Sequence, residues 1–400
     1  MITRIKAKNF KCLKHLDIPL SGLTVLTGLN GSGKSSVIQA LLYMRECVAH
    51  ADGSRSSVDF KRSVLPFVTA DDVFYQFSPD SEAMVSVGVQ TNGDSGEETL
   101  SYVFDCNPKN ASLDKITVEE ETDRAPSASS VISFSSVRQL VANRLGPVDV
   151  HKYSESSVRE KDIGKRGENA VAYLSMYGGD PVLPELVMKD SYNKDSTSLM
   201  QQVNTWMRTL SRGVSLFIDS SGKSDTDIPL YFKYGSGAGD KKFRPMNVGA
   251  GLSVSLPVLV MLLSAKKGDC LIIEDPESDL HPRGQAELAR LIARAAQSGV
   301  QIILETHSDH IVNGIRVAVK KKEISPSRVN IVFFRKIIES EGTESEEQYS
   351  DYENIMMDVN GTLSKYPSDF LEEWGRLLDQ LLEDDSFAEI EEANDDSLSE

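Results

Sequence analysis

The segment from Gly28 to Ser35 has residue types and a spacing that could hold a chain of phosphates. Its sequence, GLNGSGKS, matches the pattern G-x-x-x-x-G-K-[ST] at every required position. The glycines let backbone N–H groups turn inward around phosphates, and the N-terminus of a following helix adds a partial positive charge. In this pattern Lys34 reaches the β- and γ-phosphates, and Ser35 coordinates Mg²⁺. We therefore expect ATP and Mg²⁺ as cofactors, with contacts from Asn30, Gly31, Ser32, Gly33, Lys34, Ser35 and Ser36.

Two apolar segments in the second half of the chain end in polar side chains. The segment CLIIE ends in Glu274, which Asp275 and Glu277 follow, and the segment VQIILE lies just before His307. In a doubly wound sheet, ligands bind outside the carboxyl ends of the strands. We expect Glu274 to hold Mg²⁺ through water, and either Asp275 or Glu277 to orient or deprotonate the attacking water. A histidine after the second segment can hydrogen-bond the γ-phosphate, so His307 is the expected sensor of that group.

The elements around these groups predict an α/β protein. An apolar, β-branched run at 23–27 reads as a buried strand before the glycine loop, and residues 36–44 after the loop have helical spacing. Residues 84–89 and 100–104 alternate like antiparallel strands. Downstream, expected strands alternate with helices, which favours a largely parallel sheet: strand 270–274, helix 282–298, strand 300–305 and strand 329–334. The expected fold is a phosphate-loop core with a mostly parallel sheet, an antiparallel β subdomain and a helical insertion.

Shifts in composition predict five consecutive regions. They are an N-terminal lobe with the phosphate loop and antiparallel subdomain (1–106), a mostly helical insertion (107–245), a C-terminal lobe with the acids and His307 (246–340), a small helical cap with Trp374 packed inside (341–382), and an acidic tail (383–400). The tail contains nine acidic residues and no basic one, so we expect it to be solvated and disordered.

Composition predicts a cytoplasmic protein that is not embedded in a membrane. The longest apolar run, 256–263, is too short to span a bilayer, and we find no signal peptide at the N-terminus. The four cysteines are scattered without C-x-x-C spacing, which fits reduced thiols and argues against a zinc site. The net charge is −17, and the acidic tail carries a large part of it. The rest of the chain is still mildly acidic, so the overall charge does not support DNA binding.

Several of these motifs resemble one family of ATPases. The opening IKAKNFK, the loop LTGLNGSGKSS, the acidic segment IEDPESDLHP and the segment ETHS are typical of ABC-type ATPases of the RecF, SMC and OLD group. More closely, the chain resembles the compact stand-alone ATPases of bacterial anti-phage defence systems such as Septu and PARIS. The likeness covers roughly residues 1–50 and 245–335.

The resemblance implies further site residues and a partner. Residues 247–255 would be the signature segment, which in the family closes over the γ-phosphate of nucleotide bound by a second copy. Gly251 and Ser253 would make that contact, and Lys11, at the end of the opening motif, is counted with the nucleotide contacts. ATP would then be sandwiched between two heads of a homo-oligomer, and hydrolysis would let them part.

Two departures from the family pattern bear on catalysis. Many relatives have Asp then Glu at the end of the acidic strand, whereas this chain has Glu274 then Asp275. A shorter side chain at the base position leaves water less well placed, so slow hydrolysis is expected, and Glu277 could take over. The glutamine that links metal and γ-phosphate in the family is assigned to Gln76, which would then be a metal ligand with Ser35 and Glu274.

Three functions follow as hypotheses. The first is an ATP-hydrolysing switch in phage defence that controls a separate effector protein, such as a nuclease, because no effector domain follows Phe334. The second is a DNA repair ATPase that clamps DNA, suggested by the basic residues Arg316 and 320–322. The third is a nucleotide-gated scaffold that does not hydrolyse ATP. The effector, the trigger and the oligomer size are open from sequence alone.

Overall fold

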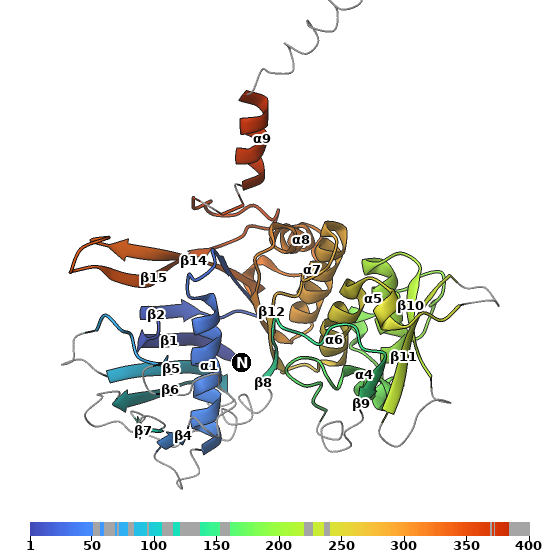
Figure 1. Cartoon of the computed structure of the whole chain (residues 1–400), viewed down its shortest axis with the longest axis horizontal. Helices are drawn as coiled ribbons and strands as arrows, with labels where there is room; N and C mark the ends of the chain where they lie inside the picture. The colour runs from blue at the N-terminus through green and yellow to red at the C-terminus, as the bar shows by residue number, and fades with distance from the viewer. Residues whose placement is uncertain are drawn as a thin grey trace, which may run out of the picture. The chain divides into compact units, whose positions relative to one another are not determined.

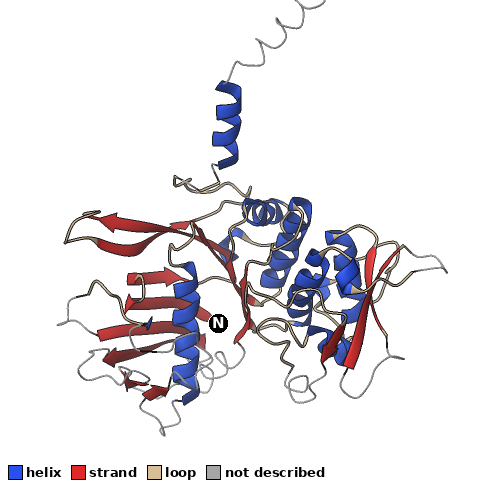
Figure 2. Ribbon diagram, in the orientation of Figure 1, coloured by secondary structure: helices blue, strands red, loops and turns tan. Residues whose placement is uncertain are grey.

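The computed structural model describes the chain in several stretches. They are residues 1–50, 57–59, 69, 72–78, 84–93, 96–105, 115–120, 137–152, 161–219, 227–235, 241–368, 370–371 and 373–383. Residues 1–364 form one compact unit and residues 365–400 a second. Helices and strands are mixed through the first unit, which is an α/β fold as expected (Figures 1 and 2).

A six-stranded sheet carries the glycine loop and the acidic segments. Its order is β15-β14-β3-β13-β12-β8, and all neighbours run parallel except the edge pair β14 and β15. The strands are β3 (Leu23–Gly28), β8 (Val137–Leu140), β12 (Cys270–Glu274), β13 (Gln301–Glu305), β14 (Val329–Glu339) and β15 (Glu347–Ile355). The carboxyl ends of β3, β12 and β13 therefore meet at one edge, where a doubly wound sheet places ligands.

Helices cover this sheet and follow its strands. They are α6 (Ala250–Ser264), α7 (Pro282–Gln297) and α8 (Asp309–Lys320), of which α7 and α8 lie side by side (Figure 1). Local sequence sets where they begin: α7 has Pro282 at its first position, and the Ser308 hydroxyl caps α8 by accepting hydrogen bonds from two backbone N–H groups. Short 3-10 helices, η4 (Pro245–Asn247) and η5 (Pro326–Arg328), precede α6 and β14.

An antiparallel sheet forms the N-terminal lobe with the helix that follows the glycine loop. Its order is β2-β1-β5-β6-β7-β4, with β1 (Ile2–Phe10), β2 (Leu13–Pro19), β4 (Ser57–Asp59), β5 (Met84–Gly93), β6 (Gly96–Asp105) and β7 (Lys115–Glu120). Helix α1 (Lys34–His50) packs on this sheet. The Tyr43 ring on α1 lies 4.8 Å from the ring of Phe104 and 6.1 Å from that of Phe10, centroid to centroid. This aromatic contact fixes the helix whose first turn carries Lys34 and Ser35.

The region 107–245 is not the mostly helical insertion that we expected. Its described part contains α4 (Ala170–Tyr177), η3 (Pro184–Leu186) and α5 (Leu199–Leu210), but also β7, β8 and a small sheet. That sheet has the order β10-β11-β9, with β9 (Val150–Lys152), β10 (Val214–Ile218) and β11 (Asp227–Tyr234). In β11 every second side chain is buried, because one face packs inward and β-branched and aromatic residues favour such a pleated surface.

The region 341–382 also differs from the expected helical cap. Strand β15 pairs with β14 from Ile331 and Ile355 to Glu339 and Glu347, so residues 347–355 extend the main sheet. The second unit contributes one described helix, α9 (Glu373–Glu383), while the side chain of Trp374 and the tail 384–400 lie outside the described residues. Among the helices that the structure describes, none is both long and apolar enough to cross a lipid bilayer.

Candidate active site

The glycine loop joins β3 to α1 with a backbone that only glycine tolerates. Gly28 and Gly33 have φ values of +137° and +104°. A Cβ atom on Gly28 would lie 2.1 Å from the backbone oxygen of Phe334, and one on Gly33 would lie 2.2 Å from the hydroxyl of Ser350. Both positions therefore exclude other side chains by conformation and by space.

Lys34 is folded back onto the loop that precedes it. Its Nζ atom donates hydrogen bonds to the backbone oxygens of Gly28, at 2.9 Å, and Leu29, at 2.8 Å, and the residue is 3% exposed. Burial lowers the pKa of Lys34, and the negative charges of Glu305 and Asp275 oppose that shift. The ammonium group therefore lies beside acids that come from the two distant strands β12 and β13.

The remaining loop residues divide into exposed and buried groups. Asn30, Gly31 and Ser35 are exposed, whereas Ser32 and Ser36 are buried. The Ser36 hydroxyl lies 3.2 Å from the Sγ atom of Cys12.

Ser35 makes a contact that the sequence analysis did not anticipate. Its hydroxyl donates a 2.8 Å hydrogen bond to Oε1 of Glu305, the last residue of β13, while Oε2 of Glu305 is buried and has no partner among the described residues. Burial raises the pKa of Glu305 to about 7, and the nearby charges of Glu274 and Asp275 add to that rise. Glu305 was missed because we read it as the end of an apolar strand. Its place at a carboxyl strand end, directly before Thr306, was the available signal.

Glu274 lies next to Glu305 across the paired strands and is held by the edge strand β8. Its Oε1 atom accepts a 2.8 Å hydrogen bond from the side-chain amide of Gln139, and its Oε2 atom accepts one of 3.4 Å from the N–H of Ala142. Burial raises the pKa of Glu274, while these hydrogen bonds oppose the rise. Gln139 is a second site residue that sequence reasoning missed, and no motif marked it.

Asp275 has an unusual backbone conformation that holds it at the strand end. Its φ is +42°, in a region that residues other than glycine rarely adopt. Its N–H donates a 2.9 Å hydrogen bond to the backbone oxygen of Glu305, and its Oδ1 atom is buried without a hydrogen-bond partner in the described part of the chain. A strained residue with an unsatisfied carboxylate oxygen is typical of a functional position.

Glu277 is tied to the segment that carries His307. Its Oε1 atom accepts hydrogen bonds from the Thr306 hydroxyl, at 2.7 Å, and from the N–H of His307, at 2.9 Å. Burial raises the pKa of Glu277, and those hydrogen bonds oppose the rise. Both Oε1 contacts hold Glu277 against the end of β13.

The imidazole of His307 is close to the glycine loop and to Lys34. Partial burial and the positive charge of Lys34 lower the pKa of His307, whereas Asp275 and a hydrogen bond to the Gly28 backbone act in the opposite direction. The lowered pKa leaves the ring neutral at pH 7. The structure therefore brings Glu274, Asp275 and His307 to Lys34 and Ser35, which were grouped from sequence alone.

The first turn of α6 packs against the segment that follows the acids. A Cβ atom on Gly251 would lie 2.2 Å from the backbone oxygen of Asp279, so this contact requires glycine. Ser253 is 7% exposed, and its hydroxyl has no hydrogen-bond partner among the described residues. The expected contact of these two residues with nucleotide on a second copy remains a prediction.

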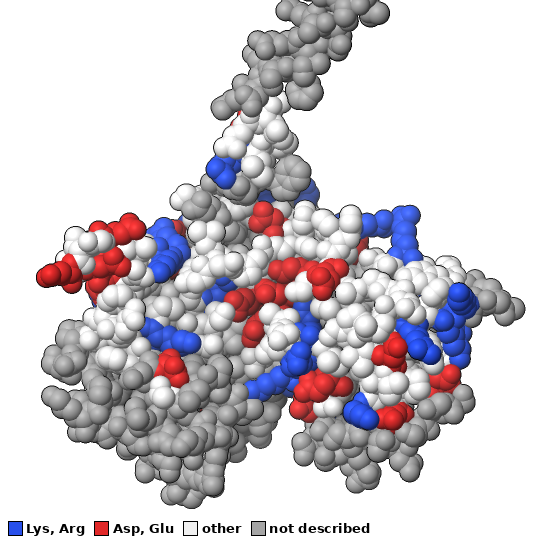
Figure 3. All heavy atoms as spheres, in the orientation of Figure 1, with Lys and Arg blue, Asp and Glu red and all other residues white. Residues whose placement is uncertain are grey.

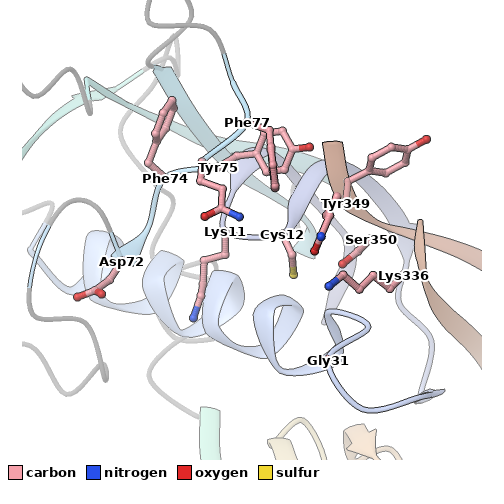
Figure 4. Close-up of a pocket in the computed structure, with 12 residues that line it drawn as sticks. Lys11, Cys12, Gly31, Asp72, Phe74, Tyr75, Phe77, Lys336, Tyr349 and Ser350 are labelled. Carbon is pink, nitrogen blue, oxygen red and sulfur yellow. The ribbon is translucent and has the colours of Figure 1, made fainter. Parts of the chain in front are cut away.

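A cavity of about 350 Å³ opens next to Gly31 of the glycine loop (Figure 4). Its walls come from the turn after β1, from residues 72–77 and from the β14–β15 hairpin, and they include Lys11, Gln76 and several aromatic rings. The Lys11 ammonium donates a 2.8 Å hydrogen bond to the side chain of Gln39, and burial lowers its pKa. Gln76 is exposed on this wall, whereas the amide next to the strand-end acids belongs to Gln139.

Comparison with protein-family models gives three matches along the chain. Residues 1–127 match "AAA ATPase domain", residues 175–313 match "AAA domain, putative AbiEii toxin, Type IV TA system", and residues 324–381 match "Protein of unknown function (DUF3696)". The two AAA matches contain the glycine loop, the acidic segment and His307.

Comparison with individual proteins agrees with these models. A curated relative, an OLD nuclease of Thermus scotoductus, is 23% identical over an alignment of 343 positions that covers 77% of this chain and 59% of that protein. The chain thus spans less than two thirds of that relative. A crystal structure of an SMC head bound to the C-winged helix domain of ScpA matches with a TM-score of 0.51 and 13% identity, covering 89% of this chain and 98% of the other. That likeness concerns the fold alone. The chain is thus similar in sequence to AAA-type ATPase domains and to an OLD nuclease, and similar in fold to an SMC head.

Proposed function

We propose that this protein binds ATP with Mg²⁺ and hydrolyses it at the edge of the main sheet. One observation carries the proposal: Lys34 and Ser35 of the glycine loop lie together with Glu305, Asp275 and His307, which arrive from two other strands. A phosphate-binding loop with acids and a neutral imidazole at the same edge provides the groups that phosphoryl transfer to water requires.

The loop and two carboxylates fit the binding of a Mg²⁺–phosphate complex. Lys34 would exchange its two backbone acceptors for phosphate oxygens, since an ammonium prefers a charged acceptor. Mg²⁺ keeps several waters and takes one or two carboxylates or hydroxyls, so Ser35 would hold it with Glu305 or Glu274 in support. When bound, the ion neutralises charge that develops on the phosphate oxygens. We propose Gln139 rather than Gln76 as the amide beside this position.

Asp275 is the better placed of the two candidate bases. Its charge acts on both Lys34 and His307, and its buried oxygen has no partner in the described structure. Glu277 also has a buried oxygen without a partner in the described structure, but its Oε1 atom accepts hydrogen bonds from Thr306 and the N–H of His307, so Glu277 would hold that histidine in place. The neutral His307 ring can then donate a hydrogen bond to the γ-phosphate.

The cavity beside Gly31 fits the nucleoside part of the ligand. It opens next to the loop and combines aromatic side chains with the Lys11 ammonium (Figure 4). Aromatic faces stack on bases, and cations attract the phosphates nearest the sugar.

We further propose that ATP pairs two copies of this protein and that this pairing controls a partner effector in cytoplasmic anti-phage defence. Support comes from the signature turn at Gly251 and from the matching family model, whose description includes a type IV toxin–antitoxin system. The relative named OLD nuclease adds to this, although its nuclease activity is not carried over, because the chain spans 59% of it.

A nucleotide-gated scaffold is the second candidate. The shorter side chain of Asp275 at the base position favours slow or absent turnover.

A DNA clamp has less support from the described surface. Arg316 donates hydrogen bonds to Gly361 and Asn313, and on the face in Figure 3 basic side chains are scattered among acidic ones.

Phosphate release from the purified protein with Mg²⁺ and ATP tests the hydrolysis proposal. Lys34→Ala should weaken binding of a fluorescent ATP analogue about 100-fold, because it removes roughly 3 kcal/mol of charge-assisted contacts. Light scattering with and without ATP tests the pairing. Binding without phosphate release would favour the scaffold, and undiminished binding by Lys34→Ala would contradict the site.

A further inference from the structure

A buried arginine lies beneath the strand-end acids without any assigned role. Arg144 follows β8 in the loop that starts at Val141, and it is 5% exposed. Burial lowers the pKa of its guanidinium, and the charges of four neighbouring carboxylates oppose that shift: Asp275, Glu277, Glu274 and Asp279. A buried cation is costly unless its donors are used, so the partners of this side chain are informative.

The Arg144 guanidinium donates only to backbone oxygens in the hydrogen bonds that the structure describes. Nη1 reaches Glu274 at 2.7 Å and Val141 at 3.3 Å, Nη2 reaches Asp275 at 2.5 Å, and Nε reaches Val254 at 3.2 Å. None of these acceptors is a carboxylate. The side chains of Glu274 and Asp275 therefore stay available for other contacts while their backbone is fixed.

Three of the four carbonyls belong to the parts of the site that must keep their geometry. Glu274 ends β12, Asp275 follows it directly, and Val254 lies in the early part of α6, next to Ser253. The carbonyl of Asp275 also accepts hydrogen bonds from the N–H and hydroxyl of Ser278, at 3.1 and 2.9 Å. These bonds surround the one strand-end acid that has a positive φ.

We propose that Arg144 is a positioning residue that holds Asp275 in its strained conformation and links it to the signature helix α6. This inference rests on the proposed ATP hydrolysis. One rigid side chain thereby couples the acid that faces bound nucleotide to the turn that would meet a second copy. A shift of either Asp275 or the start of α6 would then move the other through the same guanidinium.

The loop that carries Arg144 is fixed independently of the site. The N–H groups of Val141 and Leu145 donate 2.9 Å hydrogen bonds to the backbone oxygens of Lys165 and Arg166. Lysine cannot replace Arg144, because a single ammonium lacks the planar fork that reaches separate acceptors in fixed directions.

The test compares Arg144→Lys with Arg166→Lys as a matched control. Arg166 is exposed in the same region and donates through Nε to the Asn143 carbonyl, without any described contact to β12 or α6. Arg144→Lys should lower kcat at least tenfold and leave the Kd for a fluorescent ATP analogue within about twofold. Hydrogen–deuterium exchange should become faster in residues 250–255 and 275–280 only. Arg166→Lys should change neither measurement.

Two outcomes would contradict the inference. Wild-type kcat and exchange in Arg144→Lys would remove the proposed role. Loss of folding, or faster exchange throughout the molecule, would show that Arg144 supports the fold in general. Absence of phosphate release by the wild-type protein would contradict the proposed function instead, and local exchange would still decide the role of Arg144.

Discussion

The phosphate loop and the strand-end acids are held in place in two different ways. The loop is one short stretch whose shape comes from its own backbone, through glycines with positive φ and an ammonium that bonds the loop's carbonyls. The acids come from β12 and β13, and side chains of other segments hold their carboxylates: Gln139 for Glu274, Ser35 for Glu305 and Thr306 for Glu277. Asp275 alone has a carboxylate oxygen left buried and unpartnered together with a strained backbone in the described structure.

Because of this difference, we expect that single mutations can change nucleotide binding and ATP hydrolysis independently of each other. The proposed nucleotide binding depends on the glycine loop and on Lys34, which lie together in one short stretch of the sequence. The proposed hydrolysis depends on Asp275, whose backbone is held by hydrogen bonds to β13 and from Arg144 in the loop after β8.

Asp275→Asn should have the largest effect and would sharpen the comparison. We expect kcat to fall about 100- to 1000-fold, because a positioned base contributes roughly 10² to 10⁴ in rate. The Kd for nucleotide should change little, since the loop is untouched. Steady-state phosphate release and fluorescent nucleotide binding measure the two effects separately.

Glu277→Gln is the matched control for that change. Its amide oxygen can still accept the hydrogen bonds from Thr306 and His307, so kcat should fall no more than about tenfold. A larger loss for Glu277→Gln than for Asp275→Asn would exchange the roles that we assign to the two residues.

Gly251→Ala should have an intermediate effect, because it disturbs the contact between α6 and the segment after the acids. The new Cβ would lie 2.2 Å from the Asp279 backbone oxygen, so the contact must open, and we expect unfolding to cost about 1–3 kcal/mol less. Gly249→Ala is the control, because nothing lies within 4 Å of a Cβ there. Urea denaturation compares the two variants. Equal stability of both would show that the packing of α6 on this segment is looser than described.

Asp190→Asn should have the smallest effect, because Asp190 stabilises the fold and lies outside the proposed site. Asp190 accepts hydrogen bonds from Arg208, Tyr192 and Asn193, and despite partial burial these lower its pKa. We expect a loss of about 1 kcal/mol in the free energy of unfolding at pH 7 and an unchanged kcat. Because the folded pKa lies below the ordinary value of about 3.9, wild type should lose this advantage as pH falls through the folded pKa. Denaturation at pH 7 and pH 3 measures it, and an altered kcat would break the distinction between structural and catalytic acids.

The local parts of the site could be predicted from the amino-acid sequence. A glycine loop between a strand and a helix is recognisable because the local backbone conformation requires particular residue types, as at Gly28 and Gly33. The grouping of Glu274 with His307 could be predicted in the same way, since the apolar strands before them are parallel and their carboxyl ends lie at one edge of the sheet. The α/β fold class followed from the same patterns, and its ABC type from the resemblance to known ATPases.

The distant side chains that complete the site could be identified only once the strands were placed in the sheet. Glu305 faces Ser35 because β13 lies between β3 and β12, and Gln139 and Arg144 reach the acids because β8 pairs with β12. Strand order and register are set by long-range packing, which no short motif encodes. For the same reason β8 and β15 joined the main sheet although their own segments suggested an insertion and a helical cap.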